Sequence, residues 1–378
     1  MRFVKQLALG SIAALLLAAC GGGSDIPLKV QIKSVKVIGD SLSDSGTFNG
    51  VGPFGRVFSV QDPSTQIWPE LVASSYGITS LCNTFKFTGA TYVANTTPGC
   101  TNFAVGGALI QNTSAQGGAL SPLSIAYQLG AAATTATTYS ASDLLLIDGG
   151  GNDAAGLTGA ILADQTLTAF NAFTANLAIP AATSQATAVV KGSDYMKKLA
   201  DGFSQSIKTY ALDKGATRVV IVNLPGITNT PRFVAVLNQV AAAYGGGAAG
   251  AAAKSQTDQM VRGWIAAYNA QLAVNFSGNS SVVIVDLNKE MDNQIANPAQ
   301  YGLTNVTTAL CPSSGASAVT WLQCNATALS NQTPPAGSNG KADWWKTYAF
   351  SDEFHPTPYG HKLLAQLVNK SLVSAGWL

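Results

Sequence analysis

The sequence has few charged residues and only two histidines. Charged residues make up 11% of the 378 residues, and the histidines are His355 and His361. Hydrophobic residues reach 47%, which is enough for a sizeable core and excludes a chain that is disordered throughout. Without Arg2 and Lys5, which lie in a segment that we expect to be removed, basic and acidic residues balance at 19 each. We therefore predict no basic surface and no nucleic-acid partner.

Cysteine is scarce and lacks the spacing of a metal site. Apart from Cys20 there are four cysteines, and no Cys-x-x-Cys pair occurs. We therefore predict neither a metal nor another cofactor. An even number of cysteines in an oxidising compartment indicates two disulfides. Of the three possible pairings we favour the two that close short loops, Cys82–Cys100 and Cys311–Cys324.

The N-terminus has no hydrophobic run long enough to span a bilayer. A positive start with Arg2 and Lys5 precedes a short apolar stretch at 7–19, as in a signal peptide. Residues 17–20, Leu-Ala-Ala-Cys, resemble the bacterial lipobox, in which the cysteine is lipidated after cleavage. The alternative is an ordinary secretory signal with an incidental cysteine. Since Gly21 rather than Asp follows the cysteine, we expect the outer membrane, with the periplasmic or surface orientation left open.

These features predict the domain organisation. A signal peptide at 1–19 is followed by the lipidated Cys20 and a flexible tether at 20–28. One domain then covers 29–378, with loop insertions near 79–101 and 297–347.

Strand and helix patterns alternate along the mature chain, which predicts an α/β fold with one doubly wound sheet. Ala-rich residues 160–212 are expected to form two helices broken near Gly192, and the Gly/Ala patch 241–253 a loop or frayed helix start. The expected strands are 29–38, 143–148, 218–223 and 281–286, and the other expected helices begin at Trp68 or cover 124–133, 256–276 and 359–373.

Ser41 is the candidate nucleophile. It follows the first expected strand in Gly39-Asp40-Ser41, and ligands bind at such strand ends in open α/β sheets. A serine needs a base, and His355 lies in a Pro-flanked loop three residues after Asp352, which can orient its ring. His361 lies inside the last helix, where a surface or packing role is expected.

Several short motifs together resemble the SGNH, or GDSL-type, lipase and esterase family. The resemblance covers about residues 33–375, in the family's order. Its motifs are Gly-Asp-Ser-Leu-Ser-Asp at 39–44, Asn-Phe-Ala-Val-Gly-Gly-Ala at 102–108, Gly-Gly-Asn-Asp at 150–153 and Asp-Glu-Phe-His-Pro at 352–356. The Gly-x-Ser-x-Gly motif of α/β-hydrolases is absent.

The resemblance implies a three-layer α/β/α sandwich with a mainly parallel, flavodoxin-like sheet. It implies a Ser41–His355–Asp352 acyl-enzyme mechanism, with Gly106 as an alternative to Gly107 in the oxyanion hole. The oxyanion donors would be the N–H groups of Ser41 and Gly107 and the side chain of Asn152.

The resemblance also implies an enzyme that hydrolyses esters. The surrounding sequence is most similar to bacterial phospholipase/lecithinase-type esterases, which often carry a C-terminal autotransporter barrel. We expect a form without that barrel, a monomer anchored to the membrane through Cys20. The expected substrates are small-molecule or lipid esters of short to medium chain, with chain preference set by loops 47–66, 79–101 and 297–347. Alternatives are a phospholipase, lysophospholipase or acyltransferase, a glycan O-deacetylase, or a non-catalytic surface-binding lipoprotein.

Overall fold

A parallel sheet organises the part of the chain that the computed structural model describes, residues 31–50, 55–135, 138–313 and 319–378. The strand order is β1-β4-β5-β6, with every neighbouring pair parallel. Val37 lies opposite Leu146, and Leu146 opposite Val220. The carboxyl ends of the strands therefore meet at one edge, as the alternation of strand and helix predicts. The strands are β1 (Ser34–Ile38), β4 (Asp143–Ile147), β5 (Val219–Val222) and β6 (Val282–Val285).

The central strands are continuous apolar runs because both of their faces are covered. Every residue of β4 is buried, as is every residue of β5. The one charge inside β1, Lys36, is buried next to Asp143, with 3.3 Å between Nζ and Oδ1. This ion pair lets a lysine occupy a buried strand, where an unpaired ammonium group would be very costly.

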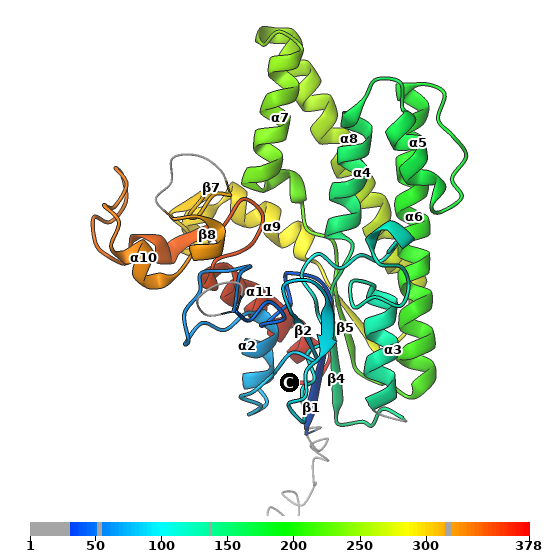
Figure 1. Ribbon diagram of the computed structural model, residues 1–378, viewed down its shortest axis with the longest axis vertical. Coiled ribbons are helices and arrows are strands. Elements are labelled where there is room, and N and C mark those ends of the chain that lie inside the picture. Colours follow the sequence, from blue (N-terminus) through cyan, green and yellow to red (C-terminus); the bar gives the residue numbers. More distant parts are fainter. Residues whose placement is uncertain (1–30, 51–54, 136–137, 314–318) are drawn as a thin grey trace, which may run out of the picture. The chain divides into compact units, whose positions relative to one another are not determined.

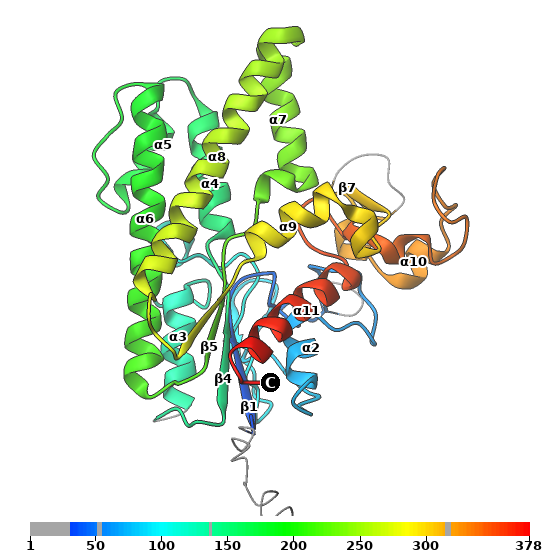
Figure 2. The same cartoon turned by 180° about the vertical axis from the view of Figure 1, so that it is seen from behind.

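Helices cover both faces of the sheet, which confirms the predicted fold class. Helices α3 and α6 lie on one face, and α2 and α11 lie on the other (Figure 1, Figure 2). The longer helices are α3 (Ile125–Thr135), α4 (Gly151–Ala163), α6 (Gln185–Tyr210), α7 (Pro231–Ala243), α8 (Gly247–Asn275), α9 (Leu287–Ala296) and α11 (Pro358–Ser374). The shorter α-helices are α2 (Trp68–Ser74), α5 (Thr168–Ala175) and α10 (Ala326–Ser330). The short 3-10 helices are η1 (Ser114–Gln116), η2 (Leu212–Lys214), η3 (Ile227–Asn229), η4 (Pro298–Tyr301), η5 (Trp321–Gln323) and η6 (Trp344–Thr347).

The expected helix break at Gly192 is wrong. Helix α6 continues through it, and the breaks in 160–212 fall instead between α4, α5 and α6. Gly192 is buried where α6 packs against α8, and a Cβ there would lie 2.2 Å from the ring of Trp264. The indole Nε1 of Trp264 donates to the carbonyl of Val189, 2.8 Å away. This glycine therefore makes room for a large side chain on the neighbouring helix.

The Gly/Ala patch at 241–253, expected to be a loop or a frayed helix start, is helical over most of its length and contains the start of α8. Helix α7 ends at Ala243 and α8 begins at Gly247, and the two helices project as a hairpin (Figure 1). Alanine has the highest helix propensity, so small residues suffice here. Gly250 allows the close crossing, because a Cβ would lie 2.3 Å from the carbonyl oxygen of Ala241.

Both insertions contain short strands. Residues 79–101 contain a hairpin of β2 (Phe85–Phe87) and β3 (Tyr92–Ala94), fastened by the Cys82–Cys100 disulfide. Within 297–347, β7 (Asn305–Ala309) pairs in parallel with β8 (Tyr348–Phe350). This second insertion has its own apolar cluster, which includes both Trp344 and Trp345. Both tryptophans are buried, so they are core residues of this insertion.

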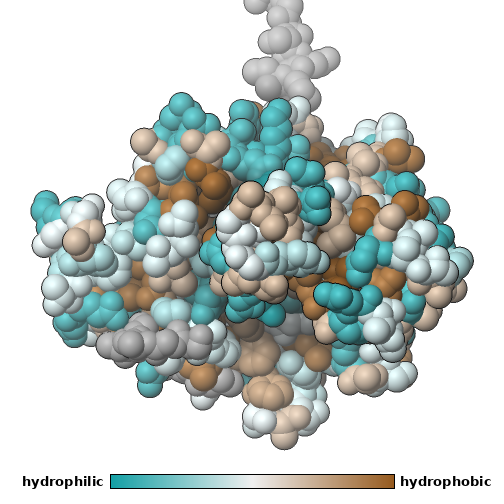
Figure 3. Space-filling view, turned by 90° about the horizontal axis from the view of Figure 1, so that it is seen from above, coloured by the Kyte–Doolittle hydropathy of each residue, from teal (hydrophilic) through white to brown (hydrophobic). Residues whose placement is uncertain are grey.

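Over the described ranges, no helix combines the length and apolar character needed to cross a membrane. Seen from above, apolar and hydrophilic residues are interspersed on the surface (Figure 3). The predicted signal peptide, Cys20 and the tether lie outside the described residues.

The α6–α8 contact predicts opposite effects for two glycines of one helix. Gly192→Ala should destabilise the fold by about 1–3 kcal/mol, because its Cβ overlaps Trp264. Gly202→Ala, at an exposed position of α6 with no atom within 4 Å, should stabilise it by about 0.5–1 kcal/mol. Urea unfolding of both variants measures this. Equal midpoints would contradict the packing argument.

Candidate active site

Ser41 lies in the turn that follows β1, and its hydroxyl contacts an imidazole. The Asp40 side chain accepts a hydrogen bond from the N–H of Leu42 at 3.0 Å, and the Asp40 carbonyl accepts one from Ser43 at 3.1 Å. This tight turn directs the Ser41 side chain toward His355. Ser41 Oγ lies 2.7 Å from Nε2 of His355, so the structure brings together the predicted serine and base.

Asp352 holds the other side of the His355 ring. Its Oδ2 lies 2.7 Å from Nδ1 of His355, while Oδ1 accepts the N–H groups of Phe354 and His355, each at 2.7 Å. The next helix, α11, begins at Pro358 directly after its cap Thr357, whose hydroxyl accepts the N–H of Gly360. A carboxylate-centred turn and a capped helix thus fix the histidine loop from both ends.

The negative charges of Asp352 and Asp40 favour the protonated form of the His355 imidazole. Burial alone would lower the pKa of His355, but the charge and hydrogen bond of Asp352, together with the charge of Asp40, outweigh burial and raise it. For Asp352, burial would raise the pKa, but the His355 charge and the hydrogen bonds it accepts lower it. The imidazole can therefore take up a proton while Asp352 stays ionised.

Two ring contacts enclose the imidazole. The ring centroid of Phe58 lies 4.9 Å from that of His355, and that of Phe354 lies 5.6 Å away. Phe58 also covers Gly106, where a Cβ would lie 2.1 Å from the phenyl ring. This glycine is therefore required by packing.

The structure distinguishes between the two glycines considered for the oxyanion hole. The N–H of Gly106 donates to Oδ2 of Asp44 at 2.8 Å, so it is already bonded. Gly107 has φ = +83° and is exposed, and within the described part of the chain its N–H has no hydrogen-bond acceptor. Asn152 donates from Nδ2 to the carbonyl of Ala108 at 3.0 Å, which places it beside this segment and leaves one amide hydrogen for another acceptor.

Two buried carboxylates, to which the sequence alone assigns no role, hold the segment from Gly106 to Gln111. Asp44 accepts the N–H groups of Gly46, Thr47 and Gly106, although burial raises its pKa. Asp153 accepts those of Ile110 and Gln111, each at 3.0 Å, and burial raises its pKa to about 6. Asp44 ends the motif at 39–44, and Asp153 ends the motif at 150–153. An acidic residue at these two places was the one feature of the sequence that could have indicated their role.

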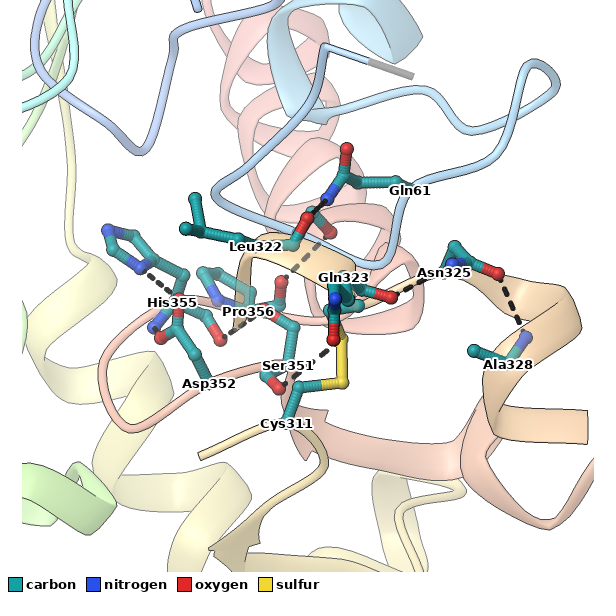
Figure 4. Close-up of a disulfide and its surroundings, with 12 residues drawn as sticks. Gln61, Cys311, Leu322, Gln323, Asn325, Ala328, Ser351, Asp352, His355 and Pro356 are labelled. Atoms are coloured by element: carbon teal, nitrogen blue, oxygen red, sulfur yellow. Dashed lines mark hydrogen bonds and ion pairs between the residues drawn. A yellow bond between two sulfur atoms is a disulfide. The ribbon is translucent and has the colours of Figure 1, made fainter. Parts of the chain in front are cut away.

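The Cys311–Cys324 disulfide lies beside the histidine loop (Figure 4). The N–H of Cys311 donates to the carbonyl of Ser351 at 2.8 Å, and that of Ser351 donates to the carbonyl of His355 at 2.8 Å. The other half of the disulfide, Cys324, accepts the N–H of Gln61 at 2.7 Å. The favoured cysteine pairing is therefore the one present. This bridge closes a loop within the insertion, and the hydrogen bond from Cys311 to Ser351 joins that loop to the segment that carries Asp352 and His355.

A largely apolar cavity of about 110 Å³ opens next to Ser41 and His355. Among the described residues of the loops expected to set chain preference, those of 297–347 reach the cavity, through Leu303. The strand ends and α9 supply more of its wall, because the cavity lies over the carboxyl ends of β5 and β6. Its apolar side chains are Leu42, Val222, Leu224, Pro225, Ile227, Leu287, Met291, Ile295, Leu303, Ala349, Phe350, Phe354, Pro356 and Leu364.

His361 is a packing residue. It is 1% exposed, and its Nδ1 accepts the N–H of Trp68 at 3.4 Å, whereas Nε2 has no partner within the described ranges. Burial, with smaller effects of the His355 and Arg56 charges, lowers its pKa to about 3. It therefore stays neutral in the folded protein.

The fold and these contacts define an α/β protein with a serine at a strand end, bonded to a histidine and an aspartate. The model of the GDSL-like lipase/acylhydrolase family matches residues 35–368. The chain belongs to this family and is a hydrolase that acts on ester bonds. A search of curated proteins finds no significant match.

His361 predicts a pH-dependent part of the stability. Because its folded pKa of about 3 lies below the unfolded value of 6.5, its contribution is complete above pH 6.5 and is lost as pH falls toward 3. Asn at this position can accept the Trp68 N–H without titrating. The free energy of unfolding of wild type relative to His361→Asn should therefore fall by up to about 1.4 kcal/mol per pH unit below pH 6.5. Urea titrations from pH 7 to 4 measure it, and parallel curves would contradict it.

Proposed function

We propose that the protein is a serine carboxylic ester hydrolase that works through an acyl-enzyme. The observation that carries this proposal is the continuous contact from Ser41 Oγ to His355 Nε2 and from His355 Nδ1 to Asp352, each at 2.7 Å. His355 takes the proton of Ser41 as the oxygen attacks the ester carbonyl. Asp352 fixes the ring orientation and stabilises the imidazolium that forms.

The tetrahedral oxyanion is held by the N–H groups of Ser41 and Gly107 and the side chain of Asn152. The N–H of Gly106 is bonded to Asp44, whereas the N–H of Gly107 has no acceptor within the described residues. This difference supports Gly107 as the oxyanion donor. Each such donor contributes roughly 3 kcal/mol of transition-state stabilisation in comparable sites. His355 then passes its proton to the leaving alcohol, and water activated by the same ring hydrolyses the acyl-enzyme.

The apolar cavity supports acyl esters as the substrates. Its apolar wall suits a hydrocarbon chain, and its size favours a short to medium one. The acyl group attached to Ser41 lies in this cavity, with the leaving group toward solvent.

Hydrolysis of chromogenic esters with two to sixteen acyl carbons tests this function. Ser41→Ala should lose at least about 1,000-fold in kcat, with a short- to medium-chain optimum in the wild type. Ser371→Ala, which removes a hydroxyl bonded only to the Leu367 carbonyl of its own helix, is the control and should keep full activity. Equal activity of wild type and Ser41→Ala would refute the nucleophile. Preferential hydrolysis of phospholipid vesicles would instead indicate a phospholipase.

We further propose that the mature protein is a monomeric outer-membrane lipoprotein anchored through Cys20. The positive, apolar and Leu-Ala-Ala-Cys segments at the N-terminus support this proposal, as do disulfides suited to an oxidising compartment. Globomycin, an inhibitor of lipoprotein signal peptidase, should make the precursor accumulate in a bacterial host, and Cys20→Ser should do the same. Maturation unaffected by both would refute the anchor.

A further inference from the structure

Two buried carboxyl groups meet directly behind the serine turn. Asp40 is 7% exposed and Asp148, which follows β4, is 3% exposed. Their carboxyl groups lie within hydrogen-bonding reach of each other. Neither forms a salt bridge within the described residues.

The backbone is shaped to admit this pair. A Cβ at Gly39 would lie 1.8 Å from Oδ1 of Asp148, so only glycine leaves room for the carboxyl group. The same Oδ1 accepts the hydroxyl of Ser43 at 2.5 Å, and the Ser43 oxygen accepts the indole N–H of Trp68 at 3.1 Å. Asp148 thus contacts the turn on both sides of Ser41.

We propose that Asp40 and Asp148 share one proton, so that the pair carries a single negative charge and clamps the Ser41 turn to the end of β4. Two carboxylates in contact inside the protein cannot both ionise without a compensating cation. A carboxyl–carboxylate hydrogen bond removes one charge and supplies the donor that joins the two strand ends. Both residues are positioning residues in this arrangement, since neither touches the reacting atoms.

The neighbouring charges assign the proton to Asp148. Burial raises the pKa of Asp40 too, but the N–H of Leu42 and the charge of His355 oppose this effect and favour the ionised form. Asp148 is buried beside Asp40, and its pKa is raised well above the usual value. The other titratable groups facing the pair, Asp153 and Tyr268, are an acid and a phenol and bring no positive charge.

One negative charge on Asp40 then acts on the histidine. It adds to Asp352 in raising the pKa of His355. The catalytic consequence rests on the proposed function, but the shared proton does not.

Infrared difference spectroscopy at pH 8 tests the shared proton without any substrate. The wild type should show the C=O stretch of a protonated carboxyl group, shifted in D₂O, and Asp148→Asn should lose it. Asp40→Asn should lose it too, because Asp148 can then ionise against an amide donor. Asp213→Asn, at an exposed carboxylate of η2, is the control and should keep the band. A wild-type spectrum without the band, or a band that persists in both site variants, would overturn the proposal.

Histidine NMR separates this proposal from the proposed function. Each single Asp→Asn variant keeps one negative charge in the pair, whereas the double variant Asp40→Asn/Asp148→Asn keeps none. The pKa of His355 should therefore fall by about one unit in the double variant and by less in Asp148→Asn. Because burial lowers the pKa of His361 to about 3, the imidazole that titrates at higher pH is that of His355. Equal shifts in Asp148→Asn and the double variant would refute the single shared charge, even in an enzyme inactive on every ester tested.

Discussion

The hydrogen bond between Ser41 and His355 joins residues 314 positions apart in the sequence, and much of the molecule serves to keep it at 2.7 Å. Ser41 is fixed through β1, the strand to which its turn belongs. His355 has no such support from the sheet, because its loop lies between the short strand β8 and helix α11. Its position depends on the cap of α11 on one side and, on the other, on the insertion closed by the Cys311–Cys324 disulfide, through the hydrogen bond from Cys311 to Ser351.

Carboxylates placed inside the protein organise the turns of this site. Asp44, Asp153 and Asp352 each accept backbone N–H groups, so each fixes a loop that has no regular structure. Burial disfavours their ionised forms, and the accepted hydrogen bonds compensate. A chain with only 19 acidic residues thus places several of them around one serine.

The sequence was sufficient to predict the fold class and to select the serine, histidine and aspartate that the structure brings into contact. Apolar runs ending in small polar residues are a local signal, and with two histidines the choice of base was nearly forced. The role of Gly192 could not be predicted from its neighbours in the sequence, because this glycine makes room for the ring of Trp264 on another helix. The residues of the cavity wall could not be predicted for a similar reason, since Met291 and Leu303 come to line the same cavity as Ser41 only after the chain has folded.

Asp40 and Asp148 show the same limit in another form. Each follows an apolar strand and looks like an ordinary polar residue at a strand end. Strands β1 and β4 pair in parallel, with Ile38 opposite Ile147. This register brings the two carboxyl groups together in the turns that follow the strands. Two negative charges in contact inside the protein would repel each other and push the strand ends apart. One retained proton removes one of these charges and lets the two carboxyl groups form a hydrogen bond instead. The register of the sheet therefore controls the protonation state behind the serine, and that state in turn contributes to the basicity of His355.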